Sequence, residues 1–211
     1  MDIPDRVKAG PVVILWLLAG VFFPPQVARA QATCSQEVAA IEAYCRKVDR
    51  LIKANHNSSR RVFIGTALDA DHASVGWRES KPDGEEAEAS SKENACVWSS
   101  QGKIVAVKFT FQSQSGNWVQ FATYYYREDG TLAMIGARLN LFRGQTTLLR
   151  EQFYDRKGVL IRGSVKSCSL KSGREQKPNK ELIPEPLPVY LTTDQLPFYQ
   201  ALAEGNAEMR K

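Results

Sequence analysis

Three short segments recur along the sequence at a spacing of 28 residues, and each carries an aromatic residue, a glycine and an aliphatic residue at equivalent positions. The equivalent residues are Trp98, Gly102 and Ile104, then Tyr126, Gly130 and Leu132, then Tyr154, Gly158 and Leu160. A glycine at this position supplies the left-handed residue that a three-residue hairpin loop needs. The recurrence therefore predicts three β-hairpins, joined into an antiparallel meander of about six strands between Asn94 and Cys168.

The segments between these glycines alternate in polarity. If each loop holds three residues, the odd-numbered residues of every strand stay on one face of the sheet. That odd face is almost entirely apolar, so we expect it to pack on the core. Residues 62–68 and 74–79 are predicted to add a hairpin at the sheet edge. The aromatic residue, glycine and aliphatic residue of each unit resemble the hairpin repeats of MORN-type bacterial proteins, and no function follows from this resemblance.

An amphipathic helix is predicted from Thr33 to Ile52, because apolar residues recur there every three or four positions. We expect this helix to lie on the odd face of the sheet. A short C-terminal helix is predicted to begin near Asp194, a residue type that caps helix N-termini. The predicted fold class is therefore mainly β with flanking helices (α+β), with the N-terminal helix packed on one face.

The first 30 residues have the pattern of a cleavable secretory signal peptide. An apolar run from Pro11 to Phe23 precedes Ala28-Arg29-Ala30, which has the small residues that signal peptidase accepts. The run is shorter than the roughly 20 residues that span a bilayer, which disfavours a membrane anchor. We therefore expect a secreted or periplasmic protein that begins near Gln31 and has no stable membrane span.

The amino-acid composition divides the chain after residue 30 into three segments. Residues 31–168 form the predicted domain of helix and sheet, 169–190 a linker rich in proline and charge, and 191–211 the C-terminal helix and tail. Without residues 1–30 the chain has 25 basic and 21 acidic residues, a net charge of +4. This charge is too small and too dispersed to indicate nucleic-acid binding.

All four cysteines, Cys34, Cys45, Cys96 and Cys168, follow the predicted cleavage site. An even number of cysteines in an oxidising compartment favours two disulfides over free thiols. Cys34 and Cys45 are about 16 Å apart on the predicted helix, whereas a disulfide needs Cα atoms within about 7 Å. We therefore expect each to pair with Cys96 or Cys168. If the helix begins later, Cys34 with Cys45 and Cys96 with Cys168 is the alternative.

The even face is the candidate binding surface, because it mixes aromatic residues with cations. The predicted ligand contacts on it are Trp118, Tyr124, Tyr126, Arg138, Arg150 and Arg162. Lys108 and Lys166 share this face. A three-residue loop at 143–145 would place Arg138 opposite Arg150, and such like charges favour an acidic or amphipathic ligand. The alternative is a half-solvated face where long basic side chains lie over apolar surface.

Recognisable catalytic motifs are absent from the sequence, which has no Gly-x-Ser-x-Gly, no glycine-rich phosphate loop and no His-Glu-x-x-His. His72 with Asp69 and Asp71 is at most a fragment of a metal site, since His56 is the only other histidine. We therefore expect a non-enzymatic domain, without cofactor or metal, that binds a partner protein or an envelope component.

A carrier of a hydrophobic or amphipathic small molecule is the alternative function. If both helices lay outside a curled sheet, the apolar face would enclose a pocket. Its lining would be Phe109, Phe121, Ile135, Leu139 and Ile161. If the N-terminal helix fills the concave side instead, no such pocket forms.

Overall fold

A computed structural model describes residues 25–54, 60–67, 75–80, 93–177 and 187–208. Its helices are α1 (Pro25–Ala54), the short 3-10 turn η1 (Thr193–Gln195) and α3 (Tyr199–Glu208). Its strands are β1 (Arg60–Ala67), β2 (Val75–Glu79), β3 (Glu93–Ser100), β4 (Lys103–Gln112), β5 (Trp118–Tyr126), β6 (Leu132–Leu141), β7 (Thr146–Tyr154), β8 (Leu160–Ser169) and β9 (Glu175–Gln176). The predicted apolar run of the signal peptide, His56 and the group around His72 lie outside the described residues.

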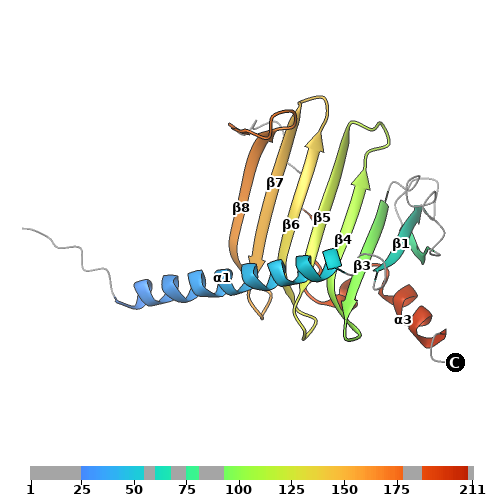
Figure 1. Ribbon diagram of the computed structural model, residues 1–211, viewed down its shortest axis with the longest axis horizontal. Coiled ribbons are helices and arrows are strands. Elements are labelled where there is room, and N and C mark those ends of the chain that lie inside the picture. Colours follow the sequence, from blue (N-terminus) through green and yellow to red (C-terminus); the bar gives the residue numbers. More distant parts are fainter. Residues whose placement is uncertain (1–24, 55–59, 68–74, 81–92, 178–186, 209–211) are drawn as a thin grey trace, which may run out of the picture.

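The described strands form one antiparallel sheet of nine strands, in the order β2-β1-β3-β4-β5-β6-β7-β8-β9. From β3 onward each strand pairs with the next along the chain, so this part of the sheet is a meander (Figure 1). The predicted class, a mainly β antiparallel meander with two helices, is confirmed. Strands β1 and β2 form the hairpin predicted at one edge from residues 62–68 and 74–79, and the short strand β9, which was not predicted, lies at the other edge.

The hairpin glycines adopt the left-handed conformation, with φ of 74° at Gly102, 82° at Gly130 and 80° at Gly158. The last two lie in three-residue loops, where Arg127 N–H donates to Thr131 O at 2.8 Å and Asp155 N–H donates to Val159 O at 2.9 Å. The loop at Gly102 is shorter, because Ser100 pairs directly with Lys103. Two residues with positive φ then make the turn, as in a type I′ hairpin.

The prediction that odd-numbered residues share one face is wrong. Gln112 pairs with Val119 and Leu141 pairs with Thr146, so these two connections hold an even number of residues. Each even-length connection exchanges the faces of odd and even positions in the strand that follows, because side chains alternate with a period of two. Further register shifts occur at Tyr125/Tyr126 and at Phe153/Tyr154. Each face of the sheet therefore combines odd and even residues from different strands.

Helix α1 covers one end of one face, which we call the α1 face (Figure 1). Val38, Ile41, Cys45 and Val48 are buried along one stripe of the helix, as the predicted periodicity requires. Their partners on the sheet are Cys96, Trp98, Val105, Ala106, Ala133 and Phe153. The helix begins before the predicted Thr33 and extends past the β8 edge of the sheet (Figure 1).

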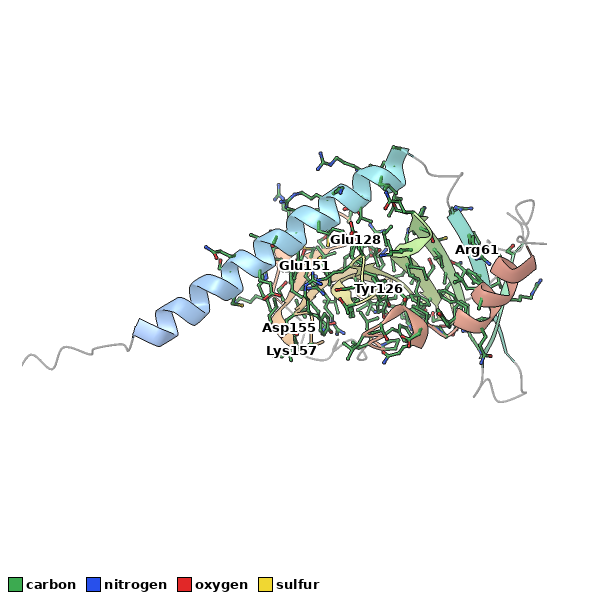
Figure 2. The ribbon with its side chains drawn as sticks, turned by 90° about the horizontal axis from the view of Figure 1, so that it is seen from below. Arg61, Tyr126, Glu128, Glu151, Asp155 and Lys157 are labelled. Atoms are coloured by element: carbon green, nitrogen blue, oxygen red, sulfur yellow. The ribbon has the colours of Figure 1, made fainter. Side chains whose placement is uncertain are left out.

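The C-terminal segment covers part of the opposite face, which we call the C-terminal face (Figure 2). Buried side chains of this segment pack against buried side chains of β1, β3, β4 and β5. Those of the segment are Leu187, Leu196, Phe198 and Leu202, and those of the sheet include Phe63, Val97, Phe109, Tyr124 and Tyr126. Part of the predicted linker therefore contributes to the core. Asp194 lies within η1, and α3 begins five residues later, after Pro197.

None of the four cysteines forms a disulfide, whereas two disulfides were predicted. Cys34 Sγ lies 3.6 Å from Ile161 O on β8, and every two-disulfide pattern must pair Cys34 with another cysteine. Cys45 is about 16 Å away along α1. Cys96 lies on β3, five strand positions away and thus about 24 Å, and Cys168 lies farther along β8 by about 23 Å. All three separations exceed the reach of a disulfide.

A pair of glycines offers a test of how the C-terminal segment docks. A Cβ atom on Gly158 would lie 3.0 Å from Leu191 Cδ1, whereas a Cβ on Gly102 would meet nothing within 4 Å. Gly102→Ala is expected to lower the free energy of unfolding by about 1 kcal/mol, the cost of a left-handed alanine. Gly158→Ala should cost more, because Leu191 must also move. Equal urea midpoints for the two variants would show that Leu191 doesn't pack on this turn.

Candidate functional site

The structure separates the six predicted ligand contacts. Tyr124 and Tyr126 are fully buried on the C-terminal face, where their hydroxyls donate to Pro188 O and Tyr190 O. Trp118, at the start of β5, lines a hollow on that same face. Arg150 also belongs to that face, because its register partners are Ala137 and Val165. Only Arg138 and Arg162 lie together on the α1 face.

The predicted opposition of Arg138 and Arg150 is wrong. Arg138 pairs with Leu149, because the β6–β7 loop holds four residues, 142–145, instead of three. The two guanidinium groups therefore leave opposite faces of the sheet. These two residues therefore do not favour an acidic ligand together, and only cations that share a face can do so.

A groove of about 440 Å³ lies on the part of the α1 face that α1 leaves open. Its lining includes Lys108, Phe121, Thr123, Gly136, Arg138, Leu149, Glu151, Ser164 and Lys166, and we call it the basic groove. Ala137 and Arg150 also border it, although the strand register assigns their side chains to the C-terminal face. Strands β4 to β8 each contribute to it.

The centre of the basic groove is an aromatic ring between two cations. Lys108 Nζ lies 5.2 Å from the centroid of the Phe121 ring, and Arg138 Cζ lies 4.9 Å from it. Both distances are within the range of a cation–π interaction. Lys166 adds a third cation on β8, while Glu151 is the groove's one carboxylate among the described lining residues. The groove therefore carries a net positive charge.

Arg162 marks the border between the basic groove and α1. Its guanidinium lies 4.1 Å from the centroid of the Phe153 ring and forms an ion pair with Glu42 of α1. Because a carboxylate of the protein already neutralises it, Arg162 is a weaker candidate for ligand contact than the sequence suggested.

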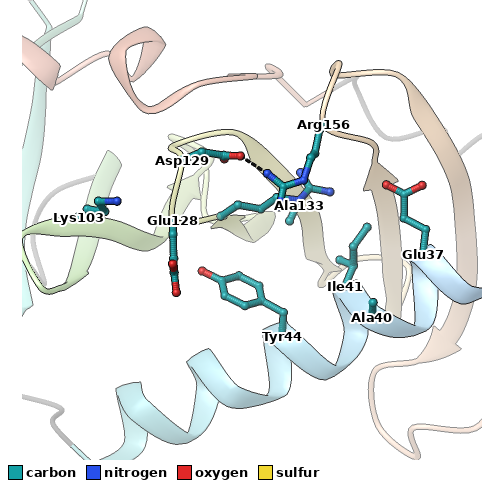
Figure 3. Close-up of a pocket in the computed structure, with 10 residues that line it drawn as sticks. Glu37, Ala40, Ile41, Tyr44, Lys103, Glu128, Asp129, Ala133 and Arg156 are labelled. Atoms are coloured by element: carbon teal, nitrogen blue, oxygen red, sulfur yellow. Dashed lines mark hydrogen bonds and ion pairs between the residues drawn. The ribbon is translucent and has the colours of Figure 1, made fainter.

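A second, larger cleft of about 610 Å³ lies between α1 and the hairpin turns (Figure 3). Its charged residues are Glu37, Glu128 and Asp129 against Lys103, Arg127 and Arg156. Most of its polar groups bond to the protein itself. Asp129 forms an ion pair with Arg156, and Tyr44 donates to Tyr126 O at 2.5 Å. Balanced charge and satisfied donors make this cleft a poorer candidate than the basic groove.

The pKa shifts of Tyr44 and Asp129 do not favour acid–base chemistry in this second cleft. Burial raises the pKa of Tyr44 to about 12, and the hydroxyl of Thr131 lowers the pKa of Asp129 by donating to its carboxylate. Tyr44 thus stays protonated and Asp129 ionised at neutral pH, whereas a general acid or base works best with a pKa near the working pH. Within the described ranges, no group of three or more His, Cys, Asp or Glu side chains is placed to hold a metal ion.

Phe121 is the groove residue that sequence reasoning misplaced. The odd-face rule assigned it to the core, together with Phe109. The signal that would have corrected this was the length of the β4–β5 connection, because Ser113 N–H donates to Trp118 O and closes an even-length loop.

The chain matches no protein-family model, no curated protein and no solved structure. None of the described helices is long and apolar enough to cross a membrane.

Proposed function

We propose that this protein is an exported, non-enzymatic domain that binds an anionic group of a partner protein or envelope component in the basic groove. The observation that carries the proposal is that Lys108 and Arg138 lie against the Phe121 ring and Lys166 lines the same groove, with Glu151 as the opposing carboxylate. A carboxylate or phosphate in the groove would gain charge-assisted hydrogen bonds from these cations. The exposed part of the Phe121 ring would contact an adjoining apolar group.

The arrangement of the predicted carrier residues supports a binding domain over a carrier. Phe109 and Ile135 are fully buried in the core of the C-terminal face. Phe121 lines the basic groove and Ile161 packs beneath α1, both on the other face. These residues therefore do not line one cavity in the described part of the chain, and the apolar stripe of α1 occupies the sheet at one end.

Reversing two charges tests the groove. Lys108→Glu with Arg138→Glu is expected to weaken binding to poly-glutamate, or to vesicles containing phosphatidylglycerol, by about 100-fold. This follows from the loss of two charged contacts of about 1.5 kcal/mol each. The matched control is Lys157→Glu with Lys171→Glu, which changes the net charge equally on exposed turns outside the groove. Isothermal titration at two salt concentrations measures both.

The outcome separates the groove from general electrostatic attraction. Wild-type binding should weaken with added salt, because surface charges are screened. Equal losses in the groove variant and the control would attribute binding to net charge alone. Failure of the wild-type protein to bind either probe would overturn the proposal.

The mass of the secreted protein tests the proposed export and cleavage. Cleavage after Ala30 would keep the contacts that α1 makes with the sheet, because the first described contacts are those of Cys34 and Val38. The protein secreted by its own host is expected to begin at Gln31. After denaturation without reductant it should take up four iodoacetamide groups, one for each cysteine, because none of them forms a disulfide. A mass that includes residues 1–30 would contradict cleavage, and uptake of fewer groups would contradict the thiol assignment.

A further inference from the structure

Strand β8 leaves most of its outer edge open. β9 pairs only with Ser167 and Cys168, and no described strand lies beside residues 160–166. Figure 1 shows β8 as the outermost long strand on this side of the sheet. An open strand edge presents unpaired N–H and C=O groups that can pair with another chain.

The direction of these backbone groups follows from two hydrogen bonds. Ser169 N–H donates outward to Arg174 O at 2.9 Å, and Leu170 N–H donates inward to Gln145 O at 2.7 Å. Backbone groups of successive strand residues point to alternate sides. The N–H and C=O groups of Gly163 and Val165 therefore point away from β7. Gly163 also lets a neighbouring backbone approach closely, because it has no side chain.

The charged side chains of this edge are basic, so they favour an acidic partner. Arg162 and Lys166 lie on the α1 face, and β8 carries no acidic residue. Arg162 is paired with Glu42, whereas Lys166 has no carboxylate partner among the described residues. On the opposite face Val165 is 55% exposed. A second copy of β8 would bring like charges together across the new pair, which is unfavourable.

We propose that the β8 edge binds an extended segment of a partner protein by strand addition, in which acidic residues alternate with apolar ones. The acidic side chains lie on the α1 face beside Lys166 and Arg162, and the apolar side chains lie on the other face beside Val165. Gly163 and Val165 supply two N–H donors and two C=O acceptors to the added strand. This site is separate from Lys108 and Arg138 at the centre of the basic groove.

The test uses a blocked peptide, Glu-Val-Glu-Thr-Glu-Val-Glu, and the same peptide N-methylated at alternate residues. N-methylation keeps the charges and removes the donors that a strand needs. Val165→Pro removes an outward N–H from the protein and leaves the β7 ladder intact, since proline is tolerated on a strand edge whose N–H faces solvent. Val165→Thr, which keeps that N–H, is the matched control.

Fluorescence anisotropy should show that N-methylation and Val165→Pro each weaken binding about tenfold or more, while Val165→Thr changes it by less than about threefold. Equal binding of the two peptides, or no binding of either, would overturn strand addition. Loss of binding in the Lys108→Glu, Arg138→Glu variant with retention in Val165→Pro would assign the peptide to the groove and overturn it too. A wild-type dimer that Val165→Pro dissociates would identify a second copy as the occupant. If Val165→Pro does not fold, the comparison of the two peptides decides.

Discussion

Replacing Phe198 with alanine is expected to lower the free energy of unfolding by about 3–5 kcal/mol, the cost of emptying a buried aromatic site. Phe198 is 1% exposed, and its ring stacks on Phe63 with the centroids 4.5 Å apart. It also contacts the rings of Trp77 and Phe109. Because these partners belong to β1, β2 and β4, one side chain joins the C-terminal segment to one edge of the sheet.

Urea denaturation measures this effect, with Tyr199→Ala as the control. Tyr199 follows Phe198 by one residue and is 40% exposed, so its removal should change stability by less than about 0.5 kcal/mol. A loss below about 1 kcal/mol for Phe198→Ala would place it among ordinary surface substitutions and contradict the packing of this segment. The comparison therefore asks whether residues beyond the predicted linker belong to the folded core.

The sequence predicted the parts of the fold that depend on local chemistry. Positive φ occurs at Gly102, Gly130 and Gly158, as the hairpin loops require. The buried stripe of α1 follows the predicted periodicity from Val38 to Val48. Both features are encoded within a few neighbouring residues, so they can be predicted without knowledge of the tertiary structure.

The assignment of residues to faces could not be predicted in the same way, because it depends on the length of every connection. One residue more or fewer in a loop moves each following side chain to the other face. The connections at 113–118 and 142–145 each differ from the expected length, and this placed Phe121 in the groove and Arg150 on the far face. The coverage of the C-terminal face was missed for another reason, since Leu187 lies in a stretch whose proline and charge are typical of a linker.

These errors affect the candidate site more than the fold. A mainly β meander survives any exchange of faces, whereas a binding surface is defined by the side chains that share one face. Lys108, Arg138 and Lys166 still share a face, because residues that pair directly across neighbouring strands lie on the same face. The pairs are Lys108↔Thr123, Phe121↔Arg138 and Leu149↔Lys166. Three cations therefore share one surface, but its aromatic residue is Phe121, because the three predicted aromatic contacts lie on the other face.

Arg127→Met is expected to lower the free energy of unfolding by about 3–6 kcal/mol, from two charge-assisted hydrogen bonds of about 1.5–3 kcal/mol each. Arg127 Nη1 donates to Leu132 O at 2.5 Å and Nη2 donates to Tyr154 O at 2.6 Å. The guanidinium thus links the β5–β6 hairpin to the start of the β7–β8 turn. Burial lowers the pKa of Arg127, but an arginine stays protonated in proteins, so the bonds persist at neutral pH.

The matched control is Arg156→Met, which removes an arginine from the same cleft. The side chain of Arg156 is 72% exposed and its one described ion-pair partner is Asp129, so its loss should cost no more than about 1 kcal/mol. Arg127→Lys should fall between the two, because a lysine ammonium cannot reproduce the planar fork that reaches both carbonyls. Equal urea midpoints for Arg127→Met and Arg156→Met would contradict the assigned role. A loss confined to Arg127 would show that a half-buried arginine joins the two hairpins through the carbonyls of Leu132 and Tyr154.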